Sequence, residues 1–148
     1  DSPPPKSLLR DEKALMEQID AAFDGVTLED GIGLMTTQLL DMYAPREVCA
    51  AVAPCEERSD WRRITPAMVR ACWDALIFTD PKGYRFLLPA WLTLDLRGQL
   101  GDFDALDYLP LLPENCGIYE SQAVLLNDRQ LEAVINFIEY RQREDCSP

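Results

Sequence analysis

Hydrophobic residues recur along most of this chain at the spacing of amphipathic helices. The first stripe has intervals of seven and four residues and consists of Leu8, Leu15, Ile19 and Phe23. Ser7 can cap the start of this segment, and Gly25 is a natural stop after it. The pattern therefore predicts a first helix over residues 7–24.

Two further helices are expected before residue 55. The second has a hydrophobic stripe formed by Ile32, Met35, Leu39, Met42 and Tyr43. Pro45 can open a short third helix, because proline is well tolerated in the first turn, and Pro54 would close it. Residues 55–60 then read as a charged surface loop, which Trp61 is expected to anchor against the core.

Capping signals mark the helices of the second half. Thr65 and Pro66 form a helix start, and the stripe after them consists of Val69, Cys72, Trp73, Leu76 and Ile77. Pro89 is expected to begin a helix that continues to about Leu100. Asn127 and Gln130 form a capping box for the last helix, which should end near residue 143 with a core stripe of Leu131, Val134, Ile135 and Ile138.

The helical period breaks at residues 78–87. This segment reads as two short extended arms around a turn, with Pro81 at the first central position and Gly83 free to adopt a positive φ. We therefore expect a mostly α protein, a compact bundle of about five or six helices with one short β-hairpin near residues 78–87. Residues 7–143 should form a single helical domain, with a disordered Pro-rich tail over residues 1–6 and a frayed tail over residues 144–148.

The charge of the chain restricts its partners. It has 26 acidic and 14 basic residues, a formal net charge of −12. Such a surface repels nucleic acid and anionic membranes and favours encounter with a basic protein, although acidity can also serve solubility alone. No apolar run is long enough to span a membrane. The chain has five cysteines, an odd number, and their spacings match no zinc or redox signature. We expect a cytoplasmic protein in which Cys49 and Cys55 either pair or remain reduced.

The sequence contains no histidine, the commonest general base and metal ligand. Serine and cysteine triads that use histidine, and zinc sites that need it, are therefore excluded. The spacing of Asp102 and Asp104 resembles the start of a calcium loop, but Asp107 stands where that loop needs glycine, and Pro113 stands where it needs glutamate. We predict no catalytic residue, no metal and no cofactor.

The candidate partner-binding residues are those with charges or typical interface chemistry. They are Asp102, Asp104 and Asp107 in an acidic loop, Glu56, Glu57 and Asp60 in the charged loop, and Tyr84 and Arg85 in the expected hairpin. The alternative for the two loops is a plain solvated surface. The alternative for the hairpin is that its aromatic residues fill the space between the flanking helices.

Residues 78–92, FTDPKGYRFLLPAWL, also carry a resemblance. They are similar to a motif of the type F-x-T-x-x-G-x-R-F-x-L-P-A in an uncharacterised bacterial family of small acidic proteins. The upstream AAFDGV, the Asp60–Trp61 pair and the last helix follow in a similar order, while Leu87 replaces a usual Tyr. The resemblance implies a bacterial origin and assigns no catalytic residue.

These observations favour a non-catalytic protein-binding domain. The most concrete hypothesis is a bacterial immunity protein that neutralises a basic toxin by occluding its active site. An intracellular adaptor or structural subunit is the alternative, and a small enzyme that depends on carboxylates is a further one, which would need a pocket with converging Asp or Glu side chains.

Overall fold

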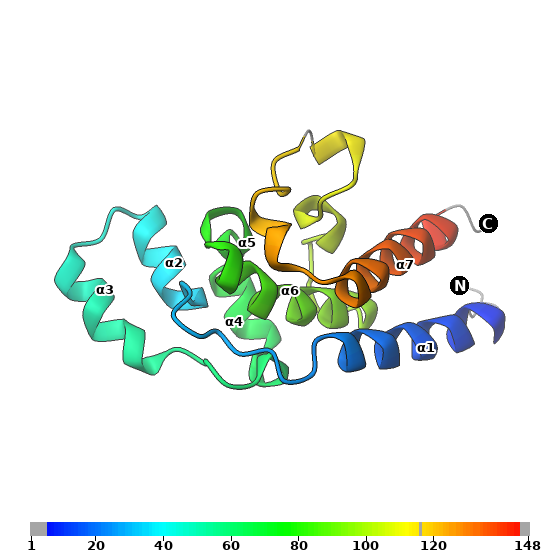
Figure 1. Cartoon of the computed structure of the whole chain (residues 1–148), viewed down its shortest axis with the longest axis horizontal. Coiled ribbons are helices and arrows are strands. Elements are labelled where there is room, and N and C mark those ends of the chain that lie inside the picture. The colour runs from blue at the N-terminus through cyan, green and yellow to red at the C-terminus, as the bar shows by residue number, and fades with distance from the viewer. Residues whose placement is uncertain (1–5, 116, 146–148) are drawn as a thin grey trace.

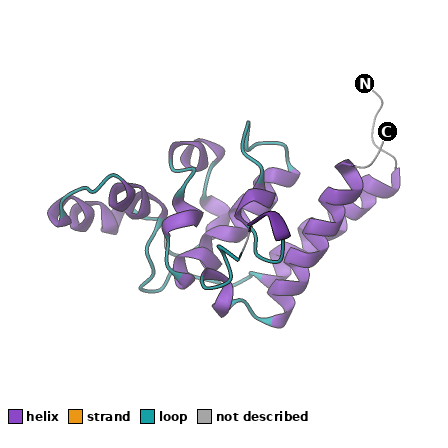
Figure 2. Cartoon of the chain, turned by 90° about the horizontal axis from the view of Figure 1, so that it is seen from above, coloured by secondary structure: helices purple, strands orange, loops and turns teal. Residues whose placement is uncertain are grey.

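The computed structural model describes residues 6–115 and 117–145 of the chain, all of them in helices, turns and loops (Figure 2). Residues 1–5 and 146–148 of the expected tails lie outside the described residues, as does Cys116, whereas the tail residues Lys6, Glu144 and Asp145 are helical. The α-helices are α1 (Lys6–Ala22), α2 (Leu34–Asp41), α3 (Arg46–Val52), α4 (Pro66–Ala71), α5 (Ala75–Phe78), α6 (Pro81–Leu96) and α7 (Asp128–Asp145). Short 3-10 helices are η1 (Ala53–Cys55), η2 (Trp61–Arg63), η3 (Ala105–Tyr108), η4 (Pro113–Asn115) and η5 (Gln122–Leu125).

The helices α1 and α7 form an antiparallel pair at one end of the molecule (Figure 1). Near the start of α7 the Gln130 amide donates to the Ala22 carbonyl at 3.1 Å, and further on Asn136 donates to Gln18 at 3.0 Å. The capping box predicted for α7 is present, since Asn127 and Gln130 exchange backbone-to-side-chain bonds. Burial of the apolar stripes on both helices holds the pair together.

Helix α6 is the centre of the fold, and α1, α5, η2, η3 and η5 all pack on it (Figure 1). A helix that is covered on every side must be apolar all round, and between residues 83 and 94 only Arg85 is not buried. The Tyr84 hydroxyl donates to the Tyr108 carbonyl at 2.6 Å, which satisfies the one polar group of that side chain. Trp91 meets the Tyr108 ring edge-on.

The predicted β-hairpin at residues 78–87 is wrong, because the described residues contain no strand and this segment forms the end of α5 and the first half of α6. Asp80 caps α6, accepting from the Gly83 backbone N–H at 2.8 Å, and Pro81 occupies the first helical position. The Asp-Pro pair that suggested a turn is thus a helix start, and Pro89, expected to begin a helix, lies inside one.

A loop before α2 packs closely on the start of α6. Asp80 also accepts from the Ile32 N–H at 3.1 Å, while the Thr79 hydroxyl donates to the Ile32 carbonyl at 2.8 Å. A Cβ at position 83 would lie 1.8 Å from the Thr79 hydroxyl oxygen and 2.4 Å from the Ile32 carbonyl oxygen. Gly83 is therefore required for this close approach.

The segment α2, α3 and η1, residues 34–55, projects from the opposite end to α1 and α7, and we refer to it as the arm (Figures 1 and 2). Helix α2 packs on α5 and α3, and it buries only Leu34 and Thr37. Helix α3 buries no residue. The stripe predicted to face the core in the second helix is wrong at three positions, since Met35, Met42 and Tyr43 are exposed.

We predict that Gly83→Ala destabilises the fold by about 2–4 kcal/mol, because the new methyl group collides with the Ile32 carbonyl and backbone must move. Chemical denaturation measures the change. Gly98→Ala is the matched control: its φ is +70° but nothing lies within 4 Å of the added Cβ, so only about 1 kcal/mol of backbone strain is expected. Equal losses in the two variants would contradict the close approach.

Candidate protein-binding site

Tyr84 and Arg85 do not form the exposed contact patch that the sequence suggested. Tyr84 is fully buried, and burial raises the pKa of its hydroxyl well above the usual value. Arg85 is 22% exposed and forms an ion pair with Glu29, which ties α6 to the loop after α1. The prediction failed for these residues because it placed them on a hairpin, whereas in α6 both are held by packing or charge.

The carboxylates of the charged loop, residues 56–60, form hydrogen bonds mainly with backbone groups of the same protein. Glu56 is buried, and its carboxylate accepts from the N–H groups of Met35 at 2.8 Å and Thr36 at 2.9 Å, at the open end of α2. Glu57 accepts from two backbone N–H groups of its own loop, and Asp60 caps η2. These three candidates therefore shape the base of the arm and are poor direct contacts for a partner.

Trp61 anchors this loop as predicted. Its ring is buried, and the indole N–H donates to the Phe23 carbonyl at 3.0 Å. Beside it, Arg62 lies over the Trp61 ring and forms ion pairs that raise its pKa. Its partners are Asp20 at 2.6 Å, Asp24 at 3.1 Å and Asp60 at 3.3 Å.

The acidic loop at residues 102–107 divides into two kinds of residue. Asp104 accepts from the Leu106 N–H at 2.9 Å and contacts Arg141 at 3.1 Å, so it holds the loop on α7. Asp102 and Asp107 are exposed. Partial burial and the neighbouring Asp104 raise the pKa of Asp107. Of the three candidates, these last two remain available to an external partner.

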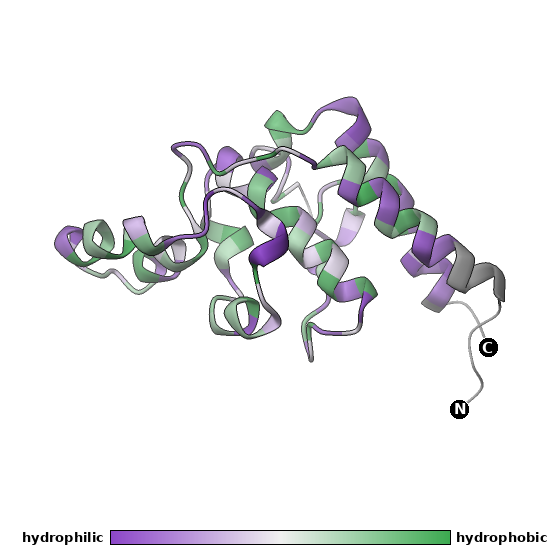
Figure 3. Ribbon diagram, turned by 90° about the horizontal axis from the view of Figure 1, so that it is seen from below, coloured by the Kyte–Doolittle hydropathy of each residue, from purple (hydrophilic) through white to green (hydrophobic). Residues whose placement is uncertain are grey.

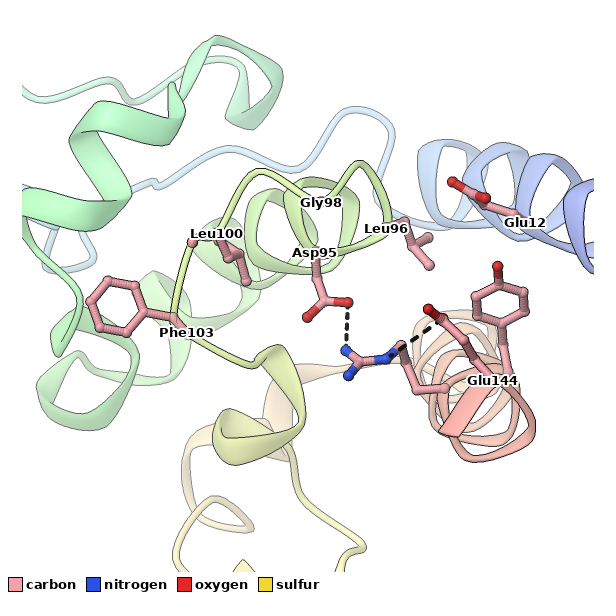
Figure 4. Close-up of a pocket in the computed structure, with 10 residues that line it drawn as sticks. Glu12, Asp95, Leu96, Gly98, Leu100, Phe103 and Glu144 are labelled. Carbon is pink, nitrogen blue, oxygen red and sulfur yellow. Dashed lines mark hydrogen bonds and ion pairs between the residues drawn. The ribbon is translucent and has the colours of Figure 1, made fainter. Parts of the chain in front are cut away.

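A cavity of about 280 Å³ lies between α1, α6 and α7 (Figure 4). Arg141 reaches Asp95 at 2.6 Å across it, and a weaker contact to Glu144 measures 3.9 Å. The second Asp95 oxygen accepts from the Ala105 N–H at 3.0 Å. Burial raises the pKa of Asp95 even though the Ala105 N–H and Arg141 act to lower it. Both oxygens of this carboxylate are occupied, so Asp95 and Arg141 form a structural ion pair at this cavity.

The metal-ligating residue types are dispersed in the described part of the chain. No group of three or more Asp, Glu or Cys side chains there could hold a metal ion. Cys49, Cys55 and Cys72 are free thiols. No helix of residues 6–115 and 117–145 has both the length and the apolar character to cross a membrane.

The arm carries a set of exposed hydrophobic side chains, three of which, Met35, Met42 and Tyr43, belong to the stripe predicted for the second helix. Tyr43 is 94% exposed and Met42 is 65% exposed, and the others are Met35, Leu40 and Val48. In Figure 3, hydrophobic positions alternate with more polar ones along this segment. Residues 31–55 contain only three charged side chains, Asp41, Arg46 and Glu47. This low charge is the feature of the sequence that could have indicated an apolar surface here.

A carboxyl pair lies where the arm meets the body of the protein. Asp41 is the last residue of α2, and its carboxyl group lies near enough to Asp74, in the turn before α5, to affect the pKa of Asp74. Asp74 is only 3% exposed. Burial, and then the nearby carboxyl group of Asp41, raise the pKa of Asp74 to about 6.

The described residues thus form a helical domain with an apolar arm. Many of its surface carboxylates form ion pairs or hydrogen bonds within the same protein. The chain belongs to the family of unknown function DUF6714, whose model matches residues 11–147. This finding confirms the expectation of an uncharacterised family. Neither the curated proteins nor the solved structures contain a match to this chain.

We predict that Arg141→Gln lowers the free energy of unfolding by about 2–3 kcal/mol at neutral pH, because Asp95 is left buried without its cation. Losing Arg141 raises the pKa of Asp95 further, so the folded state holds a proton that the unfolded state releases. The stability of the variant then falls as pH rises through that pKa. The difference in stability between the wild type and Arg141→Gln should therefore be smaller at about pH 5.

Urea denaturation at the two pH values measures this effect. Lys82→Gln is the control, because it removes an ion pair with Asp30 that is largely exposed and should change stability far less. A loss that is the same at both pH values would show that Asp95 is not the group left uncompensated.

Proposed function

We propose that this chain is a protein-binding domain whose arm contacts a basic partner that also has an apolar patch. The observation that carries the proposal is the exposure of Met42 and Tyr43 beside α3, a helix in which no residue is fully buried. A helix with no buried face gains little from packing on its own protein, and clustered exposed apolar residues mark interaction sites. Tyrosine and methionine are both enriched in interfaces.

The charge of the chain supports a basic partner. Several cationic side chains are already engaged with carboxylates of the same molecule: Arg62, Lys82, Arg85, Arg141 and Arg143. Intramolecular pairs leave the net charge of −12 unchanged, so a negative field extends from the surface. Such a field speeds encounter with a positively charged protein, while the apolar arm would supply the burial that holds the complex.

The most concrete form of this role is a bacterial immunity protein that acts in the cytoplasm and occludes the active site of a basic toxin. An adaptor or structural subunit would use the same surface and differ only in its partner. A carboxylate-dependent enzyme has less support, since Asp95, which lines the cavity and has a raised pKa, is engaged by Arg141 and by the Ala105 N–H.

Affinity capture from the source cells with matched variants tests the proposal. We predict that the double variant Met42→Ser, Tyr43→Asn loses at least about tenfold in affinity for the captured protein, because exposed apolar contacts are removed. Asn suits position 43, where φ is +57°. Val124→Asn is the control, since Val124 is 67% exposed but lies in η5, outside the arm.

Purified partner and chain then give the affinity by calorimetry at two salt concentrations. A basic partner should bind more weakly as salt rises, because screening reduces the attraction between the two proteins. Binding that survives the arm variant but not Val124→Asn, or that is indifferent to salt, would contradict the proposed surface or the proposed partner chemistry.

A further inference from the structure

A separate cavity, of about 430 Å³, lies where the end of α1 and the start of α7 meet α6. Ala22 of α1 and Gln130 of α7 both line it and are joined by a hydrogen bond, and Figure 1 shows these two helix ends side by side. The loop after α1 and Arg85 of α6 complete the lining. None of the described residues that line this cavity belongs to the arm, so a ligand bound here is independent of the proposed function.

Arg85 has hydrogen-bond donors that its own protein does not use. Its ion pair with Glu29 engages one terminal nitrogen of the guanidinium group. The Nε atom is shielded from solvent, and it has no acceptor among the described residues. A buried donor without an acceptor is costly, and nearly all such donors in folded proteins have a partner. A group with several oxygen atoms, bound against Arg85, would supply the missing acceptor.

The first turn of α7 brings further donors to the same cavity. Arg129 is exposed, and its guanidinium group forms no ion pair with the other described residues. The side-chain oxygen of Asn127 accepts from the Gln130 N–H, which leaves the Asn127 amide nitrogen to donate elsewhere. The N–H groups of the first two helical residues have no acceptor within the helix. Because the helix dipole also places positive charge at this end, the site favours an anion.

The lining has no net formal charge, although the whole chain has a net charge of −12. Arg85 and Arg129 balance Asp24 and Glu29, and both of these carboxylates are already engaged in ion pairs. Asp128, in the first turn of α7, is not among the residues that line the cavity. A bound anion therefore meets two guanidinium groups and no unpaired carboxylate.

The arrangement of donors suits a phosphate group better than a carboxylate. The two guanidinium groups come from different elements, α6 and α7, and a phosphate accepts from several directions, whereas a carboxylate is planar. The cavity has room for a small organic molecule as well as the phosphate. Opposite chemistry is also present, since Asp24, Glu29 and the exposed Thr27 hydroxyl can accept hydrogen bonds from hydroxyl groups of a ligand.

We propose that this cavity binds a small phosphorylated metabolite that carries several hydroxyl groups. The phosphate accepts from Arg85, from Arg129 and from the free N–H groups at the start of α7. The hydroxyl groups donate to the carboxylate oxygens of Asp24 and Glu29. The bound molecule joins α1, α6 and α7, so it also stabilises the folded protein by mass action.

Calorimetric titration of the whole chain at constant ionic strength tests the site. The probes are glycerol 3-phosphate, ribose 5-phosphate and glucose 6-phosphate, with inorganic phosphate and glucose as the separated parts. We expect at least one sugar or polyol phosphate to bind about tenfold or more tightly than either part, because it engages both sets of groups. Absence of binding by all three up to about 10 mM would overturn the proposal. Inorganic phosphate or glucose binding as tightly as the best probe would also contradict this ligand class.

Arg129→Gln should weaken the best probe by about tenfold or more, because it removes a charged donor from the phosphate. Arg97→Gln is the matched control: it makes the same charge change at an exposed arginine outside this cavity, and affinity should be nearly unchanged. Arg85→Lys is a second variant, which keeps a cation beside Glu29 but loses the planar set of donors, and it should also weaken binding. Equal losses for Arg129→Gln and Arg97→Gln would show that only the overall charge matters, and would refute the site.

Discussion

Burial of helix α6 on every side is the constraint that organises this protein. Its residues from Phe86 to Leu94 are all shielded, which requires neighbours on every face: α1, α5 and three short 3-10 helices. The loop at Ile32 closes one end through Asp80 and Thr79, and Gly83 allows that approach. With these neighbours in place, α2 contacts the body through α5 and through Glu56, and the arm remains largely outside the core.

The sequence predicted those elements whose causes are local. The Thr65 cap with Pro66, the capping box at Asn127 and Gln130, and the anchoring role of Trp61 are all present. The hairpin prediction failed because Pro and Gly suit a turn and a helix start equally well, and the choice depended on Asp80 capping α6. Periodicity identifies the apolar face of a helix but not whether another element covers it.

The candidate site was harder to predict because three of its charged residues, Glu56, Arg85 and Asp104, have partners far away in the sequence. Asp104 contacts Arg141, and Glu56 serves α2, so neither has the free surface role that its local context suggested. Asp102 and Asp107 remain exposed, as expected for an acidic face. The exposed apolar side chains of the arm and the burial of Asp74 were both missed, since burial and exposure depend on the tertiary fold.

The protein consists of an acidic helical body and an apolar arm. This arrangement accounts for the composition, the packing and the few charges between residues 31 and 55. Site-specific photo-crosslinking in the source cells tests this account most directly, with the crosslinker placed at position 43 or at position 124. The account predicts covalent adducts with a basic protein from position 43 and none from position 124. A partner that crosslinks from position 124 alone would contradict it.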